Sequence, residues 1–135
     1  MKDGYIKVAA VTPQVTVADV KENTKEILKV IREAAAQKAK IIVLPELCIT
    51  GYTCNDLFLQ ELLLEKAKEA LLTIAEETGQ LETLFLVGLP VDKDGRLYNV
   101  AAVLYRGRIL GMIPKKNIPM YAEFYEGRHF TPGEE

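Results

Sequence analysis

Two short apolar runs constrain the fold of this chain more than any other feature. The segments "KIIVLPE" (40–46) and "LFLVGLPV" (84–91) are rich in aliphatic residues and show no polar alternation. A strand with one face in water alternates apolar and polar residues, whereas a strand covered on both faces reads as a continuous apolar run. The two runs therefore predict strands inside a layered α/β domain.

The segments around these runs predict a mixed sheet with two main helices. We expect a mostly buried strand within "YIKVAAVTPQ" (5–14), followed by a helix over about 19–38 that opens with a capping-box pattern. The order strand, helix, strand favours parallel pairing of the first two strands. A second helix is expected within 56–79 and should stop at its final glycine.

Three strands then form a predicted antiparallel meander over 84–91, 97–105 and 108–114, because short turn sequences separate them. Two helices can cover only one face of a five-stranded layer, yet two of the strands are apolar on both faces. The other face therefore needs a partner, which is either the rest of a longer chain or another subunit.

Composition excludes several classes of function. The 135 residues carry 17 basic and 19 acidic side chains scattered along the chain, so no basic stripe is available for nucleic acid. No apolar run approaches the roughly 20 residues that span a bilayer, and no signal segment opens the chain. We therefore expect a cytoplasmic protein with no nucleic-acid or membrane partner. The single histidine and two cysteines lack the spacing of a metal site, so no metal is expected.

The most informative polar residue is Glu46, which directly follows the apolar run and Pro45. Open α/β sheets bind their ligands at the carboxyl ends of strands, and a carboxylate held there out of water can act as a general base. The alternative is an ordinary strand-end carboxylate in solvent. Lys115 and Lys116 end the last predicted strand, where they either form an exposed basic edge or place one ammonium beside Glu46 to stabilise an oxyanion.

The cysteines, Cys48 and Cys54, are both predicted to be reduced and buried, since free cysteine is among the most buried residue types. Cys48 lies only two residues after Glu46, which leaves little room for a substrate between a thiolate and its base. His129 is expected at the surface, and no role is assigned to it.

The final segment, from Lys115 onward, has no period of 2 or 3.6 and is predicted to be irregular. It is either a loop that carries functional groups or a frayed tail. Its aromatic residues would fold it over the core or make it a pocket lid, with a carboxylate that binds a substrate amine. These residues are Tyr121, Phe124, Tyr125 and Phe130, with Glu123 and Glu126 among them.

Three motifs together resemble the carbon-nitrogen hydrolase (nitrilase-like) superfamily: "IIVLPELCITGY", "GLPVDKDGRLYNVAAVLYRGRILGMIPK" and "NIPMYAEFYEGRHFTPGE". More narrowly, "GYTCNDLFLQ" and "PKKNIPMYAEFYEGRHF" are similar to the glutaminase domain of glutamine-dependent NAD synthetases. The resemblance runs from about Ile6 to the last residue. It implies the N-terminal half of an αββα sandwich, with the rest of the domain beyond this chain.

The resemblance also implies roles for single residues. Glu46 matches the general base, Lys115 the catalytic lysine and Glu126 a second glutamate that orients the site or binds the substrate amine. Tyr52 and Tyr121 match substrate-pocket positions, and Lys116 falls on a variable one. The family's nucleophilic cysteine belongs to a later Cys-Asp motif that this chain does not reach, so the 135-residue chain alone is expected to be inactive.

For the parent protein, the resemblance implies that glutamine is hydrolysed and that the ammonia passes to a C-terminal synthetase domain, which amidates deamido-NAD with ATP and magnesium. It further implies a homo-oligomer. No cofactor is expected in the 135 residues themselves. Two alternatives stay open: a fragment of a stand-alone amidase or nitrilase of the same superfamily, and a catalytically inactive half-domain with a structural role.

Overall fold

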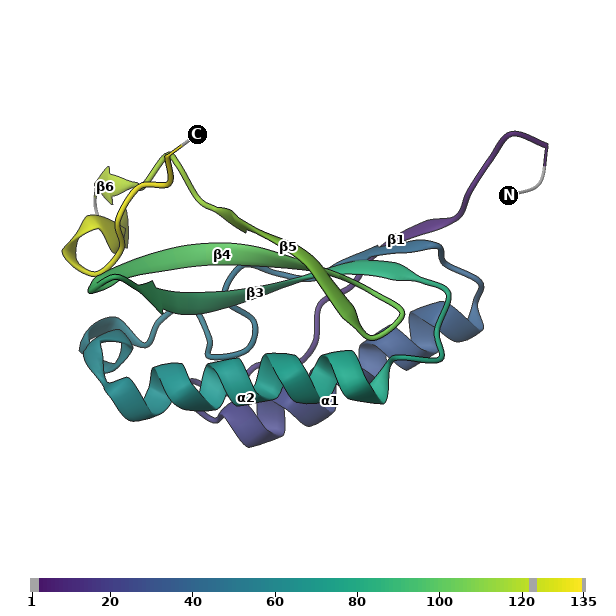
Figure 1. Ribbon diagram of the computed structural model, residues 1–135, viewed down its shortest axis with the longest axis horizontal. Helices are drawn as coiled ribbons and strands as arrows, with labels where there is room; N and C mark the ends of the chain where they lie inside the picture. The colour runs from purple at the N-terminus through teal and green to yellow at the C-terminus, as the bar shows by residue number, and fades with distance from the viewer. Residues whose placement is uncertain (1–2, 122–123, 135) are drawn as a thin grey trace.

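The computed structural model describes residues 3–121 and 124–134, and places a five-stranded sheet over two helices (Figure 1). Both helices lie on the same face of the sheet, as predicted. The elements in chain order are β1 (Val8–Ala10), α1 (Val20–Ala36), β2 (Ile41–Val43), η1 (Asn55–Leu59), α2 (Glu61–Glu77), β3 (Leu84–Lys93), β4 (Arg96–Tyr105), β5 (Arg108–Pro114), β6 (Met120–Tyr121), β7 (Phe124–Tyr125) and η2 (Glu126–Arg128).

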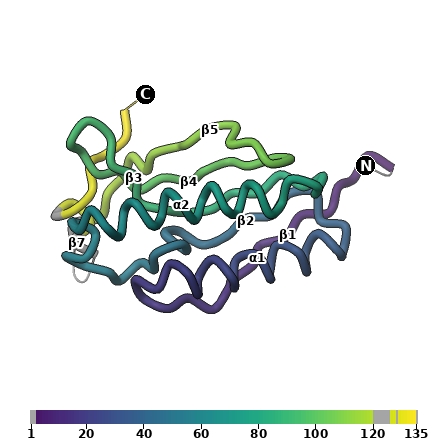
Figure 2. Tube along the Cα trace, turned by 60° about the horizontal axis from the view of Figure 1, so that its bottom comes forward, coloured from purple at the N-terminus to yellow at the C-terminus, as the bar shows by residue number. Residues whose placement is uncertain are grey.

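The strands follow their sequence order across the sheet, from β1 at one edge to β5 at the other (Figure 2). The pairs β1–β2 and β2–β3 are parallel, while β3–β4 and β4–β5 are antiparallel. Parallel pairing of the first strands and the meander are therefore confirmed. The chain reverses direction twice, after β3 and after β4, so β5 runs in the same direction as β2 and β3. The carboxyl ends of these three strands therefore lie at the same end of the sheet.

Local chemistry fixes both ends of α1. The side chain of Asp19 accepts a hydrogen bond from the backbone N–H of Glu22 at 3.1 Å, which caps the first turn. The helix stops at Ala36, shortly before Lys38 adopts a left-handed backbone with φ 66°. The second helix ends at Glu77, two residues before the predicted stop at Gly79, and the hydroxyl of Thr78 donates to the carbonyl of Ile74 at 2.6 Å.

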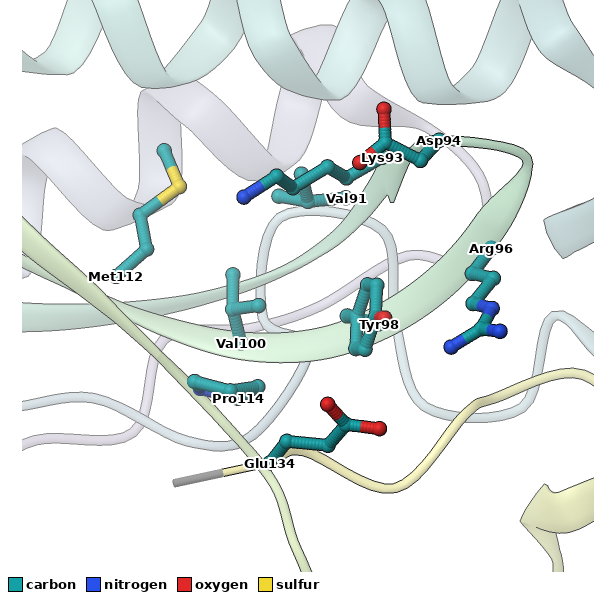
Figure 3. A pocket seen from close by; sticks show the side chains of 9 residues that line it. All are labelled: Val91, Lys93, Asp94, Arg96, Tyr98, Val100, Met112, Pro114 and Glu134. Atoms are coloured by element: carbon teal, nitrogen blue, oxygen red, sulfur yellow. The ribbon is translucent and has the colours of Figure 1, made fainter.

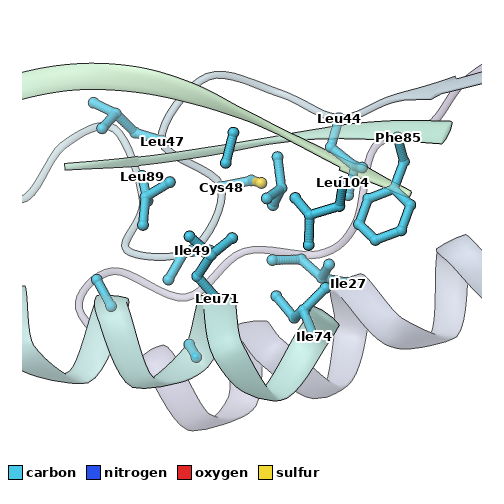
Figure 4. Packing of buried hydrophobic residues seen from close by; sticks show 14 of the residues in the cluster. Ile27, Leu44, Leu47, Cys48, Ile49, Leu71, Ile74, Phe85, Leu89 and Leu104 are labelled. Carbon is cyan, nitrogen blue, oxygen red and sulfur yellow. The ribbon is translucent and has the colours of Figure 1, made fainter. Parts of the chain in front are cut away.

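The hydrophobic core fills the space between the helices and the sheet (Figure 4). Ile27 of α1 and Ile74 of α2 point toward Phe85 of β3 and Leu104 of β4, and all four side chains are at most 1% exposed. Truncating such a side chain to alanine costs about 2–5 kcal/mol of the free energy of unfolding. This layer holds the sheet rigid and thereby fixes the strand ends that carry the polar residues described below.

The face of the sheet opposite the helices is apolar and exposed. Val8, Val43 and Ile113 on this face are 62%, 46% and 58% exposed. The predicted burial of the first strand is wrong for this chain, since β1 is only three residues long and two of them are exposed. Its apolar sequence suits a strand covered on both faces, but the chain itself covers only one of them.

The segment after Lys115 is not wholly irregular, which corrects the sequence-based expectation. It contains the two-stranded β6–β7 hairpin and the short helix η2. Backbone hydrogen bonds then tie its end to the sheet: Thr131 donates to Leu97 at 2.7 Å and Gly133 donates to Lys115 at 2.8 Å. The described part of this segment is therefore a loop that packs on the sheet, and the alternative of a frayed tail is wrong for it.

Candidate active site

Strand direction brings Glu46 and Lys115 to the same end of the sheet. Glu46 follows β2 and Lys115 follows β5, and both strands have their carboxyl ends there. The ammonium Nζ of Lys115 lies 2.6 Å from Oε1 of Glu46, within hydrogen-bonding distance. Two strands, β3 and β4, separate β2 from β5, so the chain after β2 has to cross β3 before its carboxylate can reach Lys115.

This crossing is possible because Gly88 of β3 has no side chain. A Cβ atom at this position would lie 2.4 Å from the backbone nitrogen of Leu47 and 2.9 Å from the carbonyl oxygen of Pro45. Backbone hydrogen bonds hold the loop against β3 on both sides: Leu44 donates to Leu86 at 3.1 Å, and Ile49 donates to Gly88 at 3.2 Å. The loop that carries Glu46 therefore lies directly on the strand.

The backbone turns sharply just after Glu46. Leu47 has a φ of 53°, a left-handed conformation that a non-glycine residue rarely adopts, and its side chain is fully buried. Such strain persists only where the surroundings enforce it, and it is common at functional sites. Gly51, four residues further on, has a φ of 96°, a conformation that glycine adopts without strain.

Asn23 of α1 anchors the same loop from the helix layer. Its side chain is fully buried and donates to the carbonyl oxygens of Thr16 at 2.8 Å and Ile49 at 3.0 Å, while its Oδ1 accepts from the backbone N–H of Thr16. The bond to Ile49 satisfies a buried backbone carbonyl, which would otherwise destabilise the fold, and the two bonds to Thr16 satisfy the rest of the buried Asn23 amide. The Glu46 loop is thus fixed both from the sheet and from the helices.

Asn99 of β4 is a member of the site that the sequence analysis missed. It is 3% exposed, and its side-chain amide donates to Oε1 of Glu46 at 2.5 Å. Its backbone carbonyl accepts a hydrogen bond from the N–H of Lys115 at 2.7 Å. The sequence contained one indication of this role, since Asn99 is a polar residue inside the apolar strand "LYNVAAVLY". Polar residues are buried mostly where they have a hydrogen-bond partner.

Lys115 bridges two carboxylates. Its ammonium contacts Glu46 and also lies 3.0 Å from Oε1 of Glu126, which is contributed by η2. Burial alone would lower the pKa of Lys115, but its hydrogen bonds to the two glutamates, together with their charges, raise the pKa above its ordinary value. Lys115 is therefore held as a cation, and a cluster of two carboxylates and one ammonium has a net charge of −1.

Glu126 is the most buried charged residue of this cluster, with a side chain that is 6% exposed. Its Oε1 accepts from Lys115 and from the hydroxyl of Tyr52 at 2.7 Å. Its other oxygen, Oε2, is buried and has no hydrogen-bond partner within residues 3–121 and 124–134. A buried acceptor without a donor is costly, so this oxygen is suited to receive an N–H or O–H group from a bound molecule.

Contacts between η1 and the segment around η2 hold Glu126 in place. Phe58 and Phe130 form an edge-to-face pair with ring centroids 4.9 Å apart, and His129 lies 3.0 Å from a carboxylate oxygen of Asp56. The side chain of His129 is only 9% exposed, so its predicted surface position is wrong. Among the aromatic residues of the final segment, Phe130 is the one whose side chain the structure describes. Its contact with Phe58 packs this segment against η1.

A pocket of about 360 Å³ opens beside the cluster on the exposed face of the sheet. Glu46, Asn99 and Lys115 line it together with apolar residues such as Val43 and Ile113. A larger pocket of about 690 Å³ lies between β3, β4, β5 and the C-terminal segment (Figure 3). The larger one contains none of the predicted site residues, so we regard the smaller pocket as the candidate active site.

Both cysteines are buried and free, as predicted. Burial raises the pKa of Cys48 to about 11, and it also raises the pKa of Cys54. The Cys48 thiol lies 3.8 Å from the carbonyl oxygen of Gly88, and that of Cys54 lies 3.2 Å from the carbonyl oxygen of Thr50. Neither environment favours the thiolate that covalent catalysis requires.

Tyr52 contributes its hydroxyl to the cluster, whereas Lys116 is exposed. The backbone of Tyr121 belongs to β6, but its side chain falls outside the described part of the structure, as does Glu123 altogether. Among the described residues, no group of three potential His, Cys, Asp or Glu ligands could hold a metal ion. None of the helices so described is long and apolar enough to cross a membrane.

Comparisons with known proteins agree with the fold and identify the family. The family model of carbon-nitrogen hydrolases matches residues 7–135. The glutamine-dependent NAD(+) synthetase of Mycobacterium tuberculosis is 38% identical over 131 residues, which cover 97% of this chain and 19% of that protein. The chain therefore spans about a fifth of the length of this curated relative.

Solved structures extend the comparison. A glutamine-dependent NAD(+) synthetase from Cytophaga hutchinsonii superimposes with a TM-score of 0.89 at 35% identity, over 94% of this chain and 22% of that one. An amidase from Nesterenkonia sp. superimposes with a TM-score of 0.80 at 22% identity, over 100% of this chain and 51% of that one. The amidase comparison establishes only a shared fold, which is the predicted nitrilase-like α/β fold.

Proposed function

Because this chain belongs to the carbon-nitrogen hydrolase family, we propose that it contributes the first half of a glutamine-hydrolysing domain within a longer glutamine-dependent NAD synthetase. The synthetases of M. tuberculosis and C. hutchinsonii, at 38% and 35% identity, support this choice over a stand-alone amidase. In this proposal residues 1–135 form a partial hydrolase domain, and the exposed face of the sheet receives the remainder of the αββα sandwich.

The observation that carries the proposal is the contact of Lys115 with both Glu46 and Glu126, at 2.6 and 3.0 Å. The three residues come from three separate segments, and two of them, Glu46 and Lys115, line one pocket on the exposed face. An exposed ion pair has little structural value, and a buried glutamate with an unpaired oxygen is costly. The cluster is therefore better explained by chemistry than by stability.

We assign the roles as follows. Glu46 takes the proton from the nucleophilic thiol, which attacks the amide carbon of glutamine, and returns that proton to the leaving ammonia. The ammonium of Lys115 stabilises the negative oxygen of the tetrahedral intermediate. The nucleophile itself is proposed to lie beyond residue 135, since Cys48 and Cys54 are both buried with raised pKa values.

Glu126 is proposed to bind a donor group of the substrate. Its buried Oε2 has no partner among the described residues, and the negative cluster favours a cationic or N–H group there. Tyr52 holds Glu126 through the 2.7 Å hydrogen bond and so helps to aim this oxygen. Tyr121 is kept as a substrate-pocket residue on the family motif alone.

The rest of the parent protein is proposed to use the ammonia for ATP-dependent amidation of deamido-NAD, with magnesium bound in that synthetase part. The glutamine-dependent NAD(+) synthetases to which this chain is similar support this step, as do the family motifs. We also expect a cytoplasmic homo-oligomer, as the family resemblance implies.

The test uses the parent polypeptide with Glu46→Gln. We expect glutamine-driven NAD synthesis to fall by at least about 10²-fold, the usual contribution of a general base, while ammonia-driven synthesis stays near wild type. The matched control is Glu82→Gln, which removes an exposed carboxylate that pairs with Arg106 at 3.4 Å. Equal loss with both nitrogen sources, or no glutamine-driven synthesis in the wild type, would refute the proposed function.

A further inference from the structure

The two oxygens of the Glu46 carboxylate have different surroundings. Oε1 accepts from Lys115 at 2.6 Å and from Asn99 at 2.5 Å. No donor among the described residues reaches Oε2. The side chain is 39% exposed, and the pocket of about 360 Å³ opens beside it. Both donors therefore hydrogen-bond to Oε1, and the lone pairs of Oε2 stay available.

Asn99 is placed to control this asymmetry. Its side chain is buried at 3% exposure, and only its NH2 group can donate to a carboxylate, so the chemistry fixes the orientation of the amide. Through its backbone carbonyl it also accepts the N–H of Lys115 at 2.7 Å. One residue of β4 thus holds the side chain of Glu46 and the main chain of Lys115 at the same time.

We propose that Asn99 is a positioning residue of this site, which together with Lys115 fixes Oε1 of Glu46 so that Oε2 is the oxygen that accepts and returns the proton. This inference rests on the proposed glutamine hydrolysis. In the first step the proton leaves the thiol, its S–H bonding pair stays on sulfur, and a new O–H bond forms at Oε2. In the later step that O–H bond breaks, and the proton joins the leaving nitrogen.

Two physical effects make Asn99 important for this transfer. Its amide donates to Oε1 and so stabilises the charged form of the Glu46 carboxylate. It also removes one rotational freedom of a half-exposed side chain, so that Oε2 stays within reach of the thiol. Lys115 alone could not do both, because its flexible side chain also contacts Glu126.

The test compares three variants of the parent polypeptide. Asn99→Leu removes the amide at similar volume, and Asn99→Asp keeps the shape but places a second carboxylate next to Glu46. The matched control is Thr83→Val, because Thr83 is also buried and its hydroxyl donates to the carbonyl of Ala39 at 3.0 Å, away from the pocket. The readouts are glutamate release from pH 5 to 9 and ammonia-driven synthesis.

For Asn99→Leu we expect kcat for glutamine to fall about tenfold to hundredfold with KM changed less than about threefold. The acid limb of kcat/KM should move up by roughly 0.5 to 1 in pH, because the ionised base loses a hydrogen bond. Asn99→Asp should move this limb further, since neighbouring carboxylates resist ionising together. Thr83→Val should leave the limb in place, and all three variants should keep ammonia-driven synthesis.

The outcomes separate the inference from the proposed function. Glutaminase activity in the wild type with an unmoved acid limb in both Asn99 variants would overturn the role of Asn99 alone. A limb that moves equally in Thr83→Val would overturn it as well, because a general packing effect would then explain the shift. No glutaminase activity in the wild type would overturn the proposed function and this inference with it.

Discussion

Gly88 offers the sharpest test of how the sheet positions Glu46. In a Gly88→Ala variant the new Cβ would lie 2.4 Å from the nitrogen of Leu47, 2.9 Å from the oxygen of Pro45 and 3.0 Å from the carbonyl carbon of Glu46. All three are backbone atoms, so no side-chain rotation can relieve the contact. Carbon and nitrogen normally approach to about 3.5 Å, so the loop has to retreat by about 1 Å.

A retreat of that size is large for catalysis and moderate for stability. The 2.6 Å contact between Glu46 and Lys115 would lengthen to about 3.6 Å, which is no longer a hydrogen bond. Misplacing a catalytic group by about 1 Å costs about 10²-fold in rate. Overpacking of this kind costs about 1–3 kcal/mol of the free energy of unfolding.

The assay is glutamate release by the parent polypeptide, with ammonia-driven synthesis as the internal reference and thermal unfolding as the measure of stability. The control is Gly111→Ala on β5, where an added Cβ meets no atom within 4 Å. We expect the glutaminase rate of Gly88→Ala to lie about 10²-fold below that of Gly111→Ala. Rates within about threefold of each other would show that the crossing at Gly88 does not position Glu46.

Two further predictions concern the thiols and Tyr52. Burial raises the pKa of Cys48 to about 11, so only about one Cys48 thiol in 10⁴ is ionised at pH 7, and burial also raises the pKa of Cys54. We therefore expect both cysteines to resist a disulfide reagent in the folded chain and to react with it in denaturant. Reaction of the folded chain at the rate of free cysteine would contradict the burial argument. Tyr52→Phe removes the donor to Glu126, and we expect a loss of about tenfold in glutaminase kcat/KM, from a hydrogen bond to a charged group. A Tyr105→Phe variant at the far end of β4 serves as the control, and an equal loss in both would refute the role of Tyr52.

Local patterns were sufficient for most of the fold. The apolar runs predicted β2 and β3, the turn sequences predicted the β3–β4–β5 meander, and the capping pattern at Asp19 predicted the start of α1. Each of these features depends on neighbours within a few residues along the chain. The same applies to Glu46 and Lys115, because a polar residue directly after an apolar strand is visible in the sequence itself.

Long-range contacts were not visible in this way. Asn99 meets Glu46 across 53 residues, and Tyr52 meets Glu126 across 74 residues, so no local pattern links them. Burial of β1 was predicted wrongly for a related reason, since burial depends on what covers a strand and not on the strand itself. The sequence by itself determined which segments become strands and helices and where two of the charged residues stand. Only the tertiary structure decided which oxygen of Glu46 is held and which is free, because that depends on a loop crossing β3 at a glycine to meet β4 and β5.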